Sequence, residues 1–196
     1  MKKVKYLCFD MDGTIADLYG VENWLPMLRA ENPKPYMTAE PMWDMERLNK
    51  ALLNAKKKGI KICVITWLSM DSSREYKKEV RQAKKNWLME QNFPFDKFHA
   101  VQYGTTKGDC IRGVIKSNES ATLFDDSEKV RYGWNFGDTV DPTEIDIIEY
   151  IERLVEWQVF LSVCFRRSTS KSRDWLLIIL WYNITKEWEY VIFNVG

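Results

Sequence analysis

The chain has 196 residues, of which 45% are hydrophobic and 29% charged, an ordinary composition for a soluble globular protein. Its formal net charge of +1 gives no overall attraction to nucleic acid or to an acidic membrane surface. The longest apolar run, 175–182, is far shorter than the ~20 residues that span a bilayer. Because the N-terminus enters a predicted strand without an apolar signal region, the sequence predicts a cytoplasmic protein with no membrane segment.

The cysteines and the lysine clusters indicate no special chemistry. The four cysteines lie far apart and include no Cys-x-x-Cys pair, so neither a disulfide framework nor a metal–thiolate site is predicted. We interpret the lysine clusters as solvent-exposed helix faces or strand neighbours rather than a binding surface. They occupy positions 2–3, 56–58, 77–78 and 84–85.

Strand and helix patterns alternate over most of the chain. Short apolar runs predict four strands, at 4–9, 60–65, 98–103 and 121–124. Amphipathic periodicity and capping signals predict helices over 43–58, 72–91 (with a Ser72–Glu75 capping box), 107–116 and from 141 onward. This alternation is typical of a parallel sheet covered by helices, so we expect an α/β, Rossmann-like three-layer α/β/α sandwich.

Residues 157–196 do not follow this alternation. Three aromatic-rich apolar runs predict a C-terminal antiparallel β meander, at 157–165, 175–182 and 188–195. Such a meander could extend the sheet edge, cover a site or form a homodimer contact, and its tryptophans are more typical of a core than of a base-stacking surface. We therefore divide the chain into a core, 1–156, and a β-rich extension, 157–196.

The most informative stretch runs from Asp10 to Thr14, directly after the first predicted strand. Asp10 and Asp12 leave an extended segment on opposite sides, and the following glycine lets the chain turn so that both can face one small volume. Such a volume suits a divalent cation and a phosphoryl group, because one carboxylate can attack phosphorus while the other passes a proton. An acidic turn or a calcium loop would share these residues, so the rest of the chain must decide.

Polar residues also stand at the ends of the other predicted strands. Thr66 ends the second strand, Lys107 follows the third, and Asp125 and Asp126 end the fourth. Ligands of an open parallel sheet bind beyond the carboxyl ends of its strands. We therefore expect these side chains to meet the two aspartates of the first loop.

This order of motifs, within residues 4–155, resembles the haloacid dehalogenase-like (HAD) superfamily of aspartate-dependent phosphohydrolases. The resemblance implies that Asp10 is the nucleophile that forms an aspartyl-phosphate. Asp12 would be the general acid and then the base for hydrolysis. Thr66 would hydrogen-bond a transferring phosphoryl oxygen, and Lys107 would offset charge on the nucleophile and the phosphate.

The same resemblance implies a Mg²⁺ site. Asp125, Asp10 and the backbone carbonyl of Asp12 would hold the ion, and Asp126 would support it through water. Neighbouring carboxylates repel one another unless a hard cation compensates, and oxygen ligands select magnesium over softer metals. Phospho-receiver domains use similar residues, but their acidic pair comes early in the chain, whereas here it comes last.

Three further residues are candidates for substrate contacts. Gly13 and Thr14, in the first loop, are expected to bind phosphate together with Thr66. Trp67 is bulkier than the small residue expected after Thr66, and it either stacks on a base or ring or simply walls off the pocket.

The segment 18–42 is the candidate for a cap over the site, and it is short and proline-rich. An open site and a weaker likeness to nucleotidase-like members favour a small phosphomonoester substrate, such as a (deoxy)nucleoside monophosphate. Two alternatives stay open. One is removal of a phosphate from a nucleic acid or a protein, and the other is a catalytically silent scaffold with an interaction tail.

Overall fold

The computed structural model of the chain describes residues 3–168. Its strands are β1 (Lys3–Phe9), β2 (Ala16–Asp17), β3 (Glu40–Pro41), β4 (Lys61–Leu68), β5 (Lys97–Gln102), β6 (Glu119–Phe124) and β7 (Thr139–Val140). Its helices are α1 (Trp24–Arg29), α2 (Lys34–Thr38), α3 (Met45–Lys57), α4 (Arg74–Glu90), α5 (Asp109–Arg112), α6 (Glu128–Tyr132) and α7 (Ile147–Ser168). The chain divides into two compact units, Met1–Arg153 and Leu154–Gly196, and the fold described below belongs to the first.

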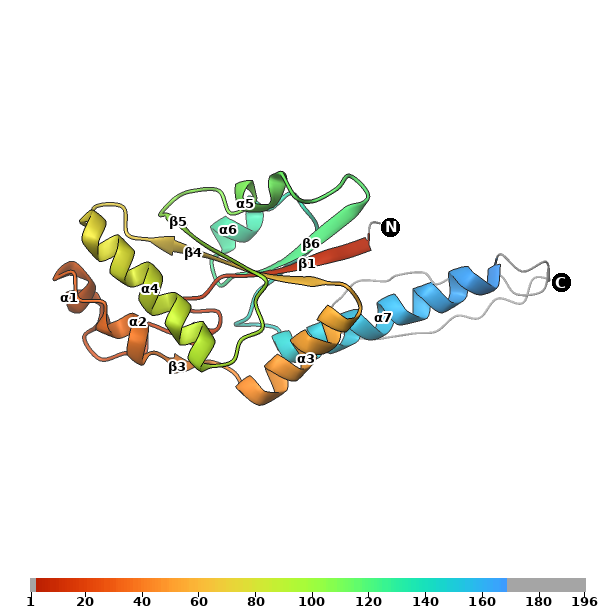
Figure 1. Cartoon of the computed structure of the whole chain (residues 1–196), viewed down its shortest axis with the longest axis horizontal. Helices are drawn as coiled ribbons and strands as arrows, with labels where there is room; N and C mark the ends of the chain where they lie inside the picture. Colours follow the sequence, from red (N-terminus) through yellow and green to blue (C-terminus); the bar gives the residue numbers. More distant parts are fainter. Residues whose placement is uncertain (1–2, 169–196) are drawn as a thin grey trace. The chain divides into compact units, whose positions relative to one another are not determined.

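A five-stranded sheet with the order β5-β4-β1-β6-β7 forms the centre of this unit (Figure 1). Every neighbouring pair in it is parallel. The second half of β1 and most of β4 are apolar and buried, as expected for strands covered on both faces. The predicted Rossmann-like parallel α/β fold is therefore confirmed, and β2 and β3 add a small antiparallel sheet.

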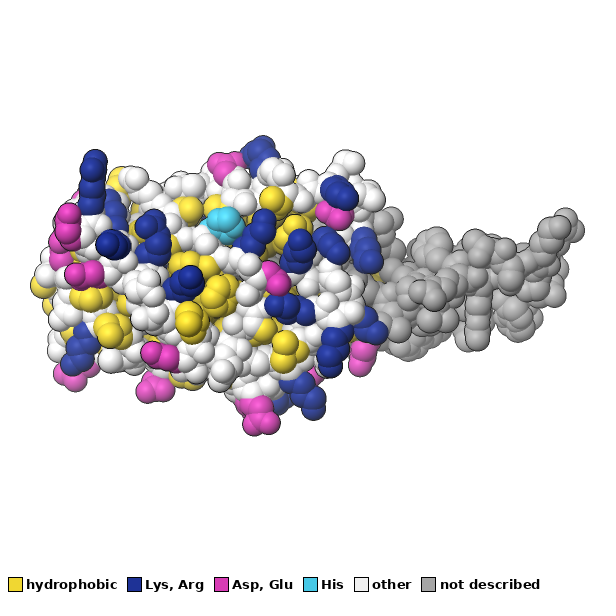
Figure 2. All heavy atoms as spheres, in the orientation of Figure 1, with side chains coloured by type: hydrophobic (Ala, Val, Ile, Leu, Met, Phe, Trp, Pro, Cys, Tyr) yellow, Lys and Arg dark blue, Asp and Glu magenta, His cyan; other side chains and the backbone are white. Residues whose placement is uncertain are grey.

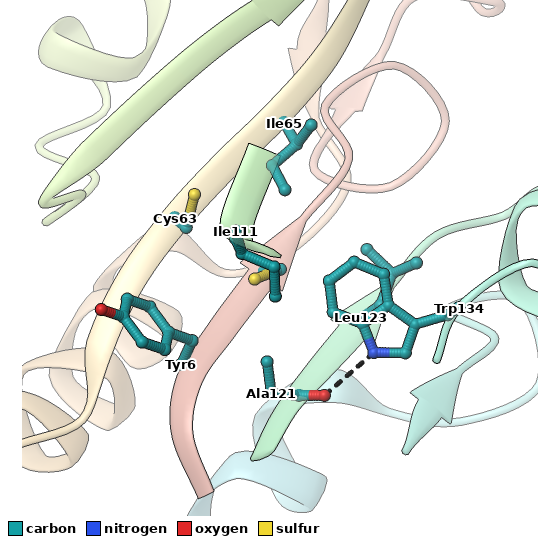
Figure 3. Close-up of a cluster of buried hydrophobic side chains, with 8 residues drawn as sticks. Tyr6, Cys63, Ile65, Ile111, Ala121, Leu123 and Trp134 are labelled. Carbon is teal, nitrogen blue, oxygen red and sulfur yellow. Dashed lines mark hydrogen bonds between the residues drawn. The ribbon is translucent and has the colours of Figure 1, made fainter. Parts of the chain in front are cut away.

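One face of the sheet packs against the segments around α5 and α6 (Figure 3). The indole N–H of Trp134 donates to the backbone carbonyl of Ala121 at 3.0 Å, which ties the loop after α6 to β6. The buried side chains of this cluster come from β1, β4, β6, α5 and that loop: Tyr6, Cys8, Cys63, Ile65, Ile111, Ala121, Leu123 and Trp134.

The opposite face is built around two stacked rings. Side chains alternate along a strand, so Phe9 of β1 points away from the Cys8 cluster. Phe9 stacks on its register partner Phe124, with ring centroids 4.5 Å apart. Phe93, after α4, and Tyr150, in the first turns of α7, meet these rings edge-on, each at 5.6 Å. Helix α3 lies on the other side of the strands from α5 and α6, which completes the three layers (Figure 1).

The predicted helices of the first half are present, with one change at a cap. Helix α4 begins after Ser73, whose hydroxyl accepts the N–H of Tyr76 at 3.1 Å, so the predicted capping box at Ser72 and Glu75 is wrong by one residue. The carboxylate of Glu31, far away in sequence, accepts the N–H and O–H of Ser73 at 2.7 and 2.5 Å. A tertiary contact therefore takes the role that the box gave to a residue of the helix itself.

The later helices differ more from prediction. The helix expected over 107–116 is reduced to α5, and the one expected from Asp141 begins only at Ile147. Asp141 accepts the N–H of Thr143 in a local turn at 2.9 Å, while Asp146 caps α7 by accepting the N–H of Ile148 at 2.8 Å. Side chains that can cap a helix can also close a turn, and here the second aspartate begins the helix.

The strand predicted at 157–165 is wrong, because α7 stays helical through Ser168. Extending an existing helix adds a hydrogen bond for each residue fixed, whereas a new strand would need a partner of its own. The helix also crosses the predicted boundary between 156 and 157. The other two predicted strands of the meander, 175–182 and 188–195, lie outside the described residues.

The cap-like segment 18–42 folds beside the end of β4. Strands β2 and β3 pair Ala16 with Pro41 and close its base, and α1 and α2 lie beside α4 (Figure 1). The proline-rich segment contains two short helices. Their apolar side chains pack with those of α4 and β4 in one cluster, which includes Leu18, Trp24, Leu28, Tyr36, Leu68, Tyr76, Val80 and Ala83.

Two more short elements, α6 and β7, escaped prediction because neither is long enough to show a period. On the face drawn in Figure 2, basic and acidic side chains are interspersed, in line with the net charge of +1. Among the described helices, none combines the length and the apolar character needed to cross a membrane.

Candidate active site

The loop after β1 is a tight turn that places two carboxylates at the edge of the sheet. The N–H of Asp10 donates to the carbonyl of Phe124 at 2.9 Å, so the loop starts against β6. The carbonyl of Met11 accepts the N–H of Ile15 and Ala16 at 3.0 and 2.9 Å, which folds the chain back on itself. Asp10 and Asp12 thereby leave the loop toward different neighbours.

Gly13 is required at the tip of this loop. Its φ of +75° is a left-handed conformation that residues with a side chain rarely adopt. A Cβ atom at this position would lie 2.7 Å from the carboxylate of Asp126 and 2.7 Å from the ring of Tyr19. The glycine therefore allows the first loop and the loop after β6 to approach each other.

Lys107 joins the first and last acidic motifs. Its Nζ lies 2.8 Å from Oδ1 of Asp10 and 2.6 Å from Oδ2 of Asp125, and both Lys107 and Asp125 are buried. Burial lowers the pKa of Lys107, but the charges of Asp10 and Asp125 outweigh it, so the net shift is upward. The structure therefore brings together three residues that the sequence placed at the ends of separate strands.

This cluster carries more negative than positive charge. Burial raises the pKa of Asp125 to about 6, and the charge of Asp10 adds to this rise against the opposing effect of Lys107. Burial and Asp10 raise the pKa of Asp126 as well. One Lys107 ammonium thus faces three carboxylates, and the charge balance favours a second cation.

Asp10, Asp125 and Asp126 fit such a cation. Each offers a carboxylate oxygen, and the three oxygens lie within 4.8 Å of one another. Oxygen donors of this kind suit a hard divalent ion such as Mg²⁺. The carboxylate of Asp12 is not in this group, and the predicted contribution of its backbone carbonyl stays a prediction.

Arg131 holds the backbone of the acidic pair, a contact that the sequence did not reveal. Its guanidinium donates to the carbonyls of Asp125 and Asp126 at 2.7 and 2.8 Å and pairs with the carboxylate of Asp141. The N–H of Ser127 also donates to Oδ1 of Asp125 at 3.0 Å. The acidic pair is therefore fixed through both its backbone and its side chain.

The turn residues expected to bind phosphate have structural tasks. The hydroxyl of Thr14 accepts the N–H of Asp126 at 3.3 Å, and its carbonyl accepts the indole N–H of Trp43 at 2.7 Å. The N–H of Gly13 donates to the carbonyl of Ala16 at 2.9 Å. Contact of Gly13 and Thr14 with phosphate stays a prediction.

Lys84 lies beside Asp12, and the prediction that it is solvent-exposed is wrong. Its Nζ lies 2.5 Å from Oδ2 of Asp12, 2.7 Å from the hydroxyl of Thr66 and 2.9 Å from the carbonyl of Trp67. Burial raises the pKa of Asp12 although Lys84 opposes this effect. One signal could have revealed the contact, because Lys84 follows Val80 by four residues and so belongs to the apolar stripe of α4.

Trp67 is held in place by three contacts. Its indole N–H donates to the carbonyl of Thr105 at 3.0 Å, and its ring centroid lies 4.7 Å from that of Tyr103. The ammonium of Lys107 lies 5.3 Å from the same ring centroid. Whether Trp67 stacks on a base or walls off the pocket stays a prediction. Tyr103 is 55% exposed, so its ring is more accessible to solvent than a ring held by three contacts.

Comparisons with known proteins do not establish the function of this chain. In sequence, the chain matches no protein-family model and no curated protein. In structure, it is similar to a crystal structure from Mesorhizobium loti that is provisionally described as a HAD-like phosphatase. The two chains share 15% identity and a TM-score of 0.48, over 79% of this chain and 88% of the other. This likeness concerns the fold, so the function below is derived from the side chains.

Proposed function

We propose that the chain is a Mg²⁺-dependent phosphomonoesterase that acts through an aspartyl-phosphate on Asp10. The observation that carries this proposal is the meeting of Asp10, Lys107, Asp125 and Asp126 at one edge of the sheet. Three partly or fully buried carboxylates around one lysine are unfavourable for folding alone. They suit phosphoryl transfer to a carboxylate once a divalent cation is bound between them, because the incoming phosphate is an anion and needs positive charge beside it.

Asp10, Asp125 and Asp126 would hold the magnesium ion, with the backbone carbonyl of Asp12 as a further ligand. When bound, the ion would offset the charge of the phosphate and make its phosphorus easier to attack. Arg131 would keep Asp125 and Asp126 in place through their carbonyls, since it contacts both.

Asp10 would act as the nucleophile. Lys107 fixes its carboxylate through Oδ1 and lies where it can also meet an oxygen of the incoming phosphate. Attack by Asp10 forms a bond between its oxygen and phosphorus while the bond to the leaving oxygen breaks. Asp12 would protonate that oxygen and would then take a proton from the water that hydrolyses the aspartyl-phosphate.

Thr66 would donate a hydrogen bond to the transferring phosphoryl group. Its hydroxyl oxygen accepts a hydrogen bond from Lys84, so the hydroxyl proton itself is left to donate. Thr66 lies near the carboxyl end of β4, which pairs with β1 on one side, whereas Asp125 follows β6, which pairs with β1 on the other side.

The substrate we propose is a small phosphomonoester, such as a (deoxy)nucleoside monophosphate. Two short helices make up the cap-like segment, and a cap of this size would suit a small molecule at the strand ends. The exposed ring of Tyr103, packed on Trp67, offers an aromatic surface on which a base could stack. We place the reaction in the cytoplasm, where Cys8 and Cys63, which are free and paired in register, would stay reduced.

A substrate panel with and without Mg²⁺ tests this proposal. It contains nucleoside monophosphates, sugar phosphates, a phosphopeptide and a 3′-phosphorylated oligonucleotide. We expect Mg²⁺-dependent release of phosphate from at least one small substrate, loss of turnover in Asp10→Asn, and normal turnover in the exposed control Asp109→Asn. Absence of turnover by the wild-type protein on every substrate would favour the silent scaffold and overturn the proposal.

A further inference from the structure

Lys84 is buried where four parts of the fold meet. It projects from α4 to the loop after β1, where Asp12 lies, and to the end of β4, where Thr66 and Trp67 lie. The ring of Tyr36, from α2, covers it with a centroid 4.7 Å from Nζ. No solvent reaches the side chain, whereas the next residue, Lys85, is exposed.

All three protons of the Lys84 ammonium have acceptors. They point to a carboxylate oxygen of Asp12, the hydroxyl of Thr66 and the carbonyl of Trp67. An ammonium has three donors and no acceptor, so none is left for a phosphate. Lys84 is therefore suited to hold other groups in place rather than to bind substrate.

The cost of burying Lys84 shows what its charge contributes. An apolar side chain of similar length could fill the same space without the penalty of removing a charge from water. It would leave the inner oxygen of Asp12 and the hydroxyl of Thr66 without their donor. Beyond filling space, Lys84 therefore orients the side chains of Asp12 and Thr66.

We propose that Lys84 is a positioning residue, which fixes the Asp12 carboxylate and the Thr66 hydroxyl at one distance from each other. This inference rests on the proposed function, in which Asp12 moves the proton and Thr66 binds the phosphoryl group. With one oxygen of Asp12 held by Lys84, the other oxygen is left for the leaving group and then for water. The group that transfers the proton and the group that contacts the phosphate thereby keep a fixed position relative to each other.

The first test compares Lys84→Met with the matched control Lys85→Met on two substrates. An alkyl phosphate needs a proton on its leaving oxygen, whereas p-nitrophenyl phosphate, with its stable leaving group, does not. We expect Lys84→Met to lower kcat for the alkyl phosphate by about 10²-fold with little change in KM. The first-turnover burst of nitrophenolate should stay within about tenfold of wild type. An equal loss for both substrates, or no loss, would overturn the proposal.

The second test is a double-mutant cycle with Asp12→Asn, measured on the same burst and turnover rates. If Lys84 acts through Asp12, Lys84→Met should change the rate of Asp12→Asn by less than about tenfold, which is the share that the orientation of Thr66 leaves. A purely structural role would instead multiply the two losses, and this result would contradict the proposal.

Thermal unfolding of each variant shows whether it is folded. If Lys84→Met does not fold, Lys84→Gln replaces it in both tests, because its amide keeps a donor near Asp12 without the charge. Lys84→Gln should lose less than about 10²-fold on the alkyl phosphate, and a full loss on both substrates would overturn the role. Inactivity of the wild-type protein on both substrates would instead overturn the proposed function, so the two failures are distinguishable.

Discussion

Two buried lysines stand on either side of the loop that carries Asp10 and Asp12, and they differ in what surrounds them. Lys107 lies between Asp10 and Asp125, with Asp126 close to both carboxylates. Lys84 faces the single carboxylate of Asp12 and two neutral oxygens. The Lys107 side is short of positive charge, whereas the Lys84 side is balanced.

The difference in charge around the two lysines indicates where a metal ion and a phosphate would bind. On the Lys107 side, a divalent cation would relieve the repulsion between carboxylates, and two of the three lysine protons are accounted for by Asp10 and Asp125. On the Lys84 side, a further cation would meet no excess of negative charge, and no lysine proton is left. Lys107 thus lies where ligands would bind, whereas Lys84 holds neighbouring side chains in place.

The largest expected effect separates the two lysines directly. Lys107→Met leaves Asp10 and Asp125 without their cation and should lower the free energy of unfolding in EDTA by about 3–5 kcal/mol. Mg²⁺ should restore part of this loss, because its ligands are the same carboxylates. Lys84→Met keeps all three proposed metal ligands and should gain from Mg²⁺ only as much stability as the wild-type protein gains. Urea unfolding with and without Mg²⁺ measures the free energy of unfolding of each variant. An equal gain from Mg²⁺ in the two variants would contradict the proposed difference between the two lysines.

The next effect concerns how closely the two acidic loops approach. Gly13→Ala should destabilise the protein by about 2–4 kcal/mol, since it combines a left-handed φ with a clash against Asp126. Gly104→Ala is the matched control, because Gly104 has a similar φ of +83° and nothing within 4 Å of the added atom. It should cost only about 1–2 kcal/mol. An equal loss of stability in the two variants, measured by thermal unfolding, would show that the close approach of Gly13 to Asp126 does not affect stability.

A smaller effect tests the support of the metal side. Arg131→Met should weaken Mg²⁺ binding by about tenfold, because the carbonyls of Asp125 and Asp126 lose the donor that orients them. Titration calorimetry of the folded variant measures the dissociation constant. Arg112→Met, which removes an exposed arginine paired with Asp109, is the control and should leave the constant unchanged.

The smallest effect is the pH dependence of the metal side. Because burial raises the pKa of Asp125 to about 6, the folded protein binds a proton between about pH 4 and 6 that the unfolded chain has released. The free energy of unfolding in EDTA should therefore fall as the pH rises through this range. The increase in Tm caused by Mg²⁺ should be larger at pH 7 than at pH 5, since the ion needs the ionised carboxylate. Both trends should be weaker in Asp125→Asn.

Residues at strand ends were predictable in a way that residues on helices were not. Asp10, Thr66 and Asp125 each follow an apolar run, and parallel strands deliver their carboxyl ends to the same edge of the sheet. Lys84 and Arg131 reach the site from helices, where the rotation of the helix against the sheet decides which side chain points inward. A lysine on an amphipathic helix is ordinarily solvated, and the only sequence signal that separated Lys84 from Lys85 was its spacing of four residues from Val80.

The helix starts and the tail show the same limit. Ser72 and Asp141 both offered good local caps, but α4 is capped by Ser73, which Glu31 contacts, and α7 is capped by Asp146. The aromatic, β-branched character of 157–165 favoured a strand, yet the helix begun at Ile147 runs on to Ser168. Local preference was overridden wherever a tertiary partner or an element already formed offered more hydrogen bonds.

Apolar runs and their polar ends are properties of the chain alone, and they were enough to predict the parallel sheet and the meeting of Asp10, Lys107, Asp125 and Asp126. The pairing of Asp12 with Lys84, and the excess of negative charge around Lys107, became visible only once the folded positions were known. Charge balance depends on distances between residues far apart in sequence, and a Coulomb interaction is set by distance and burial rather than by residue type.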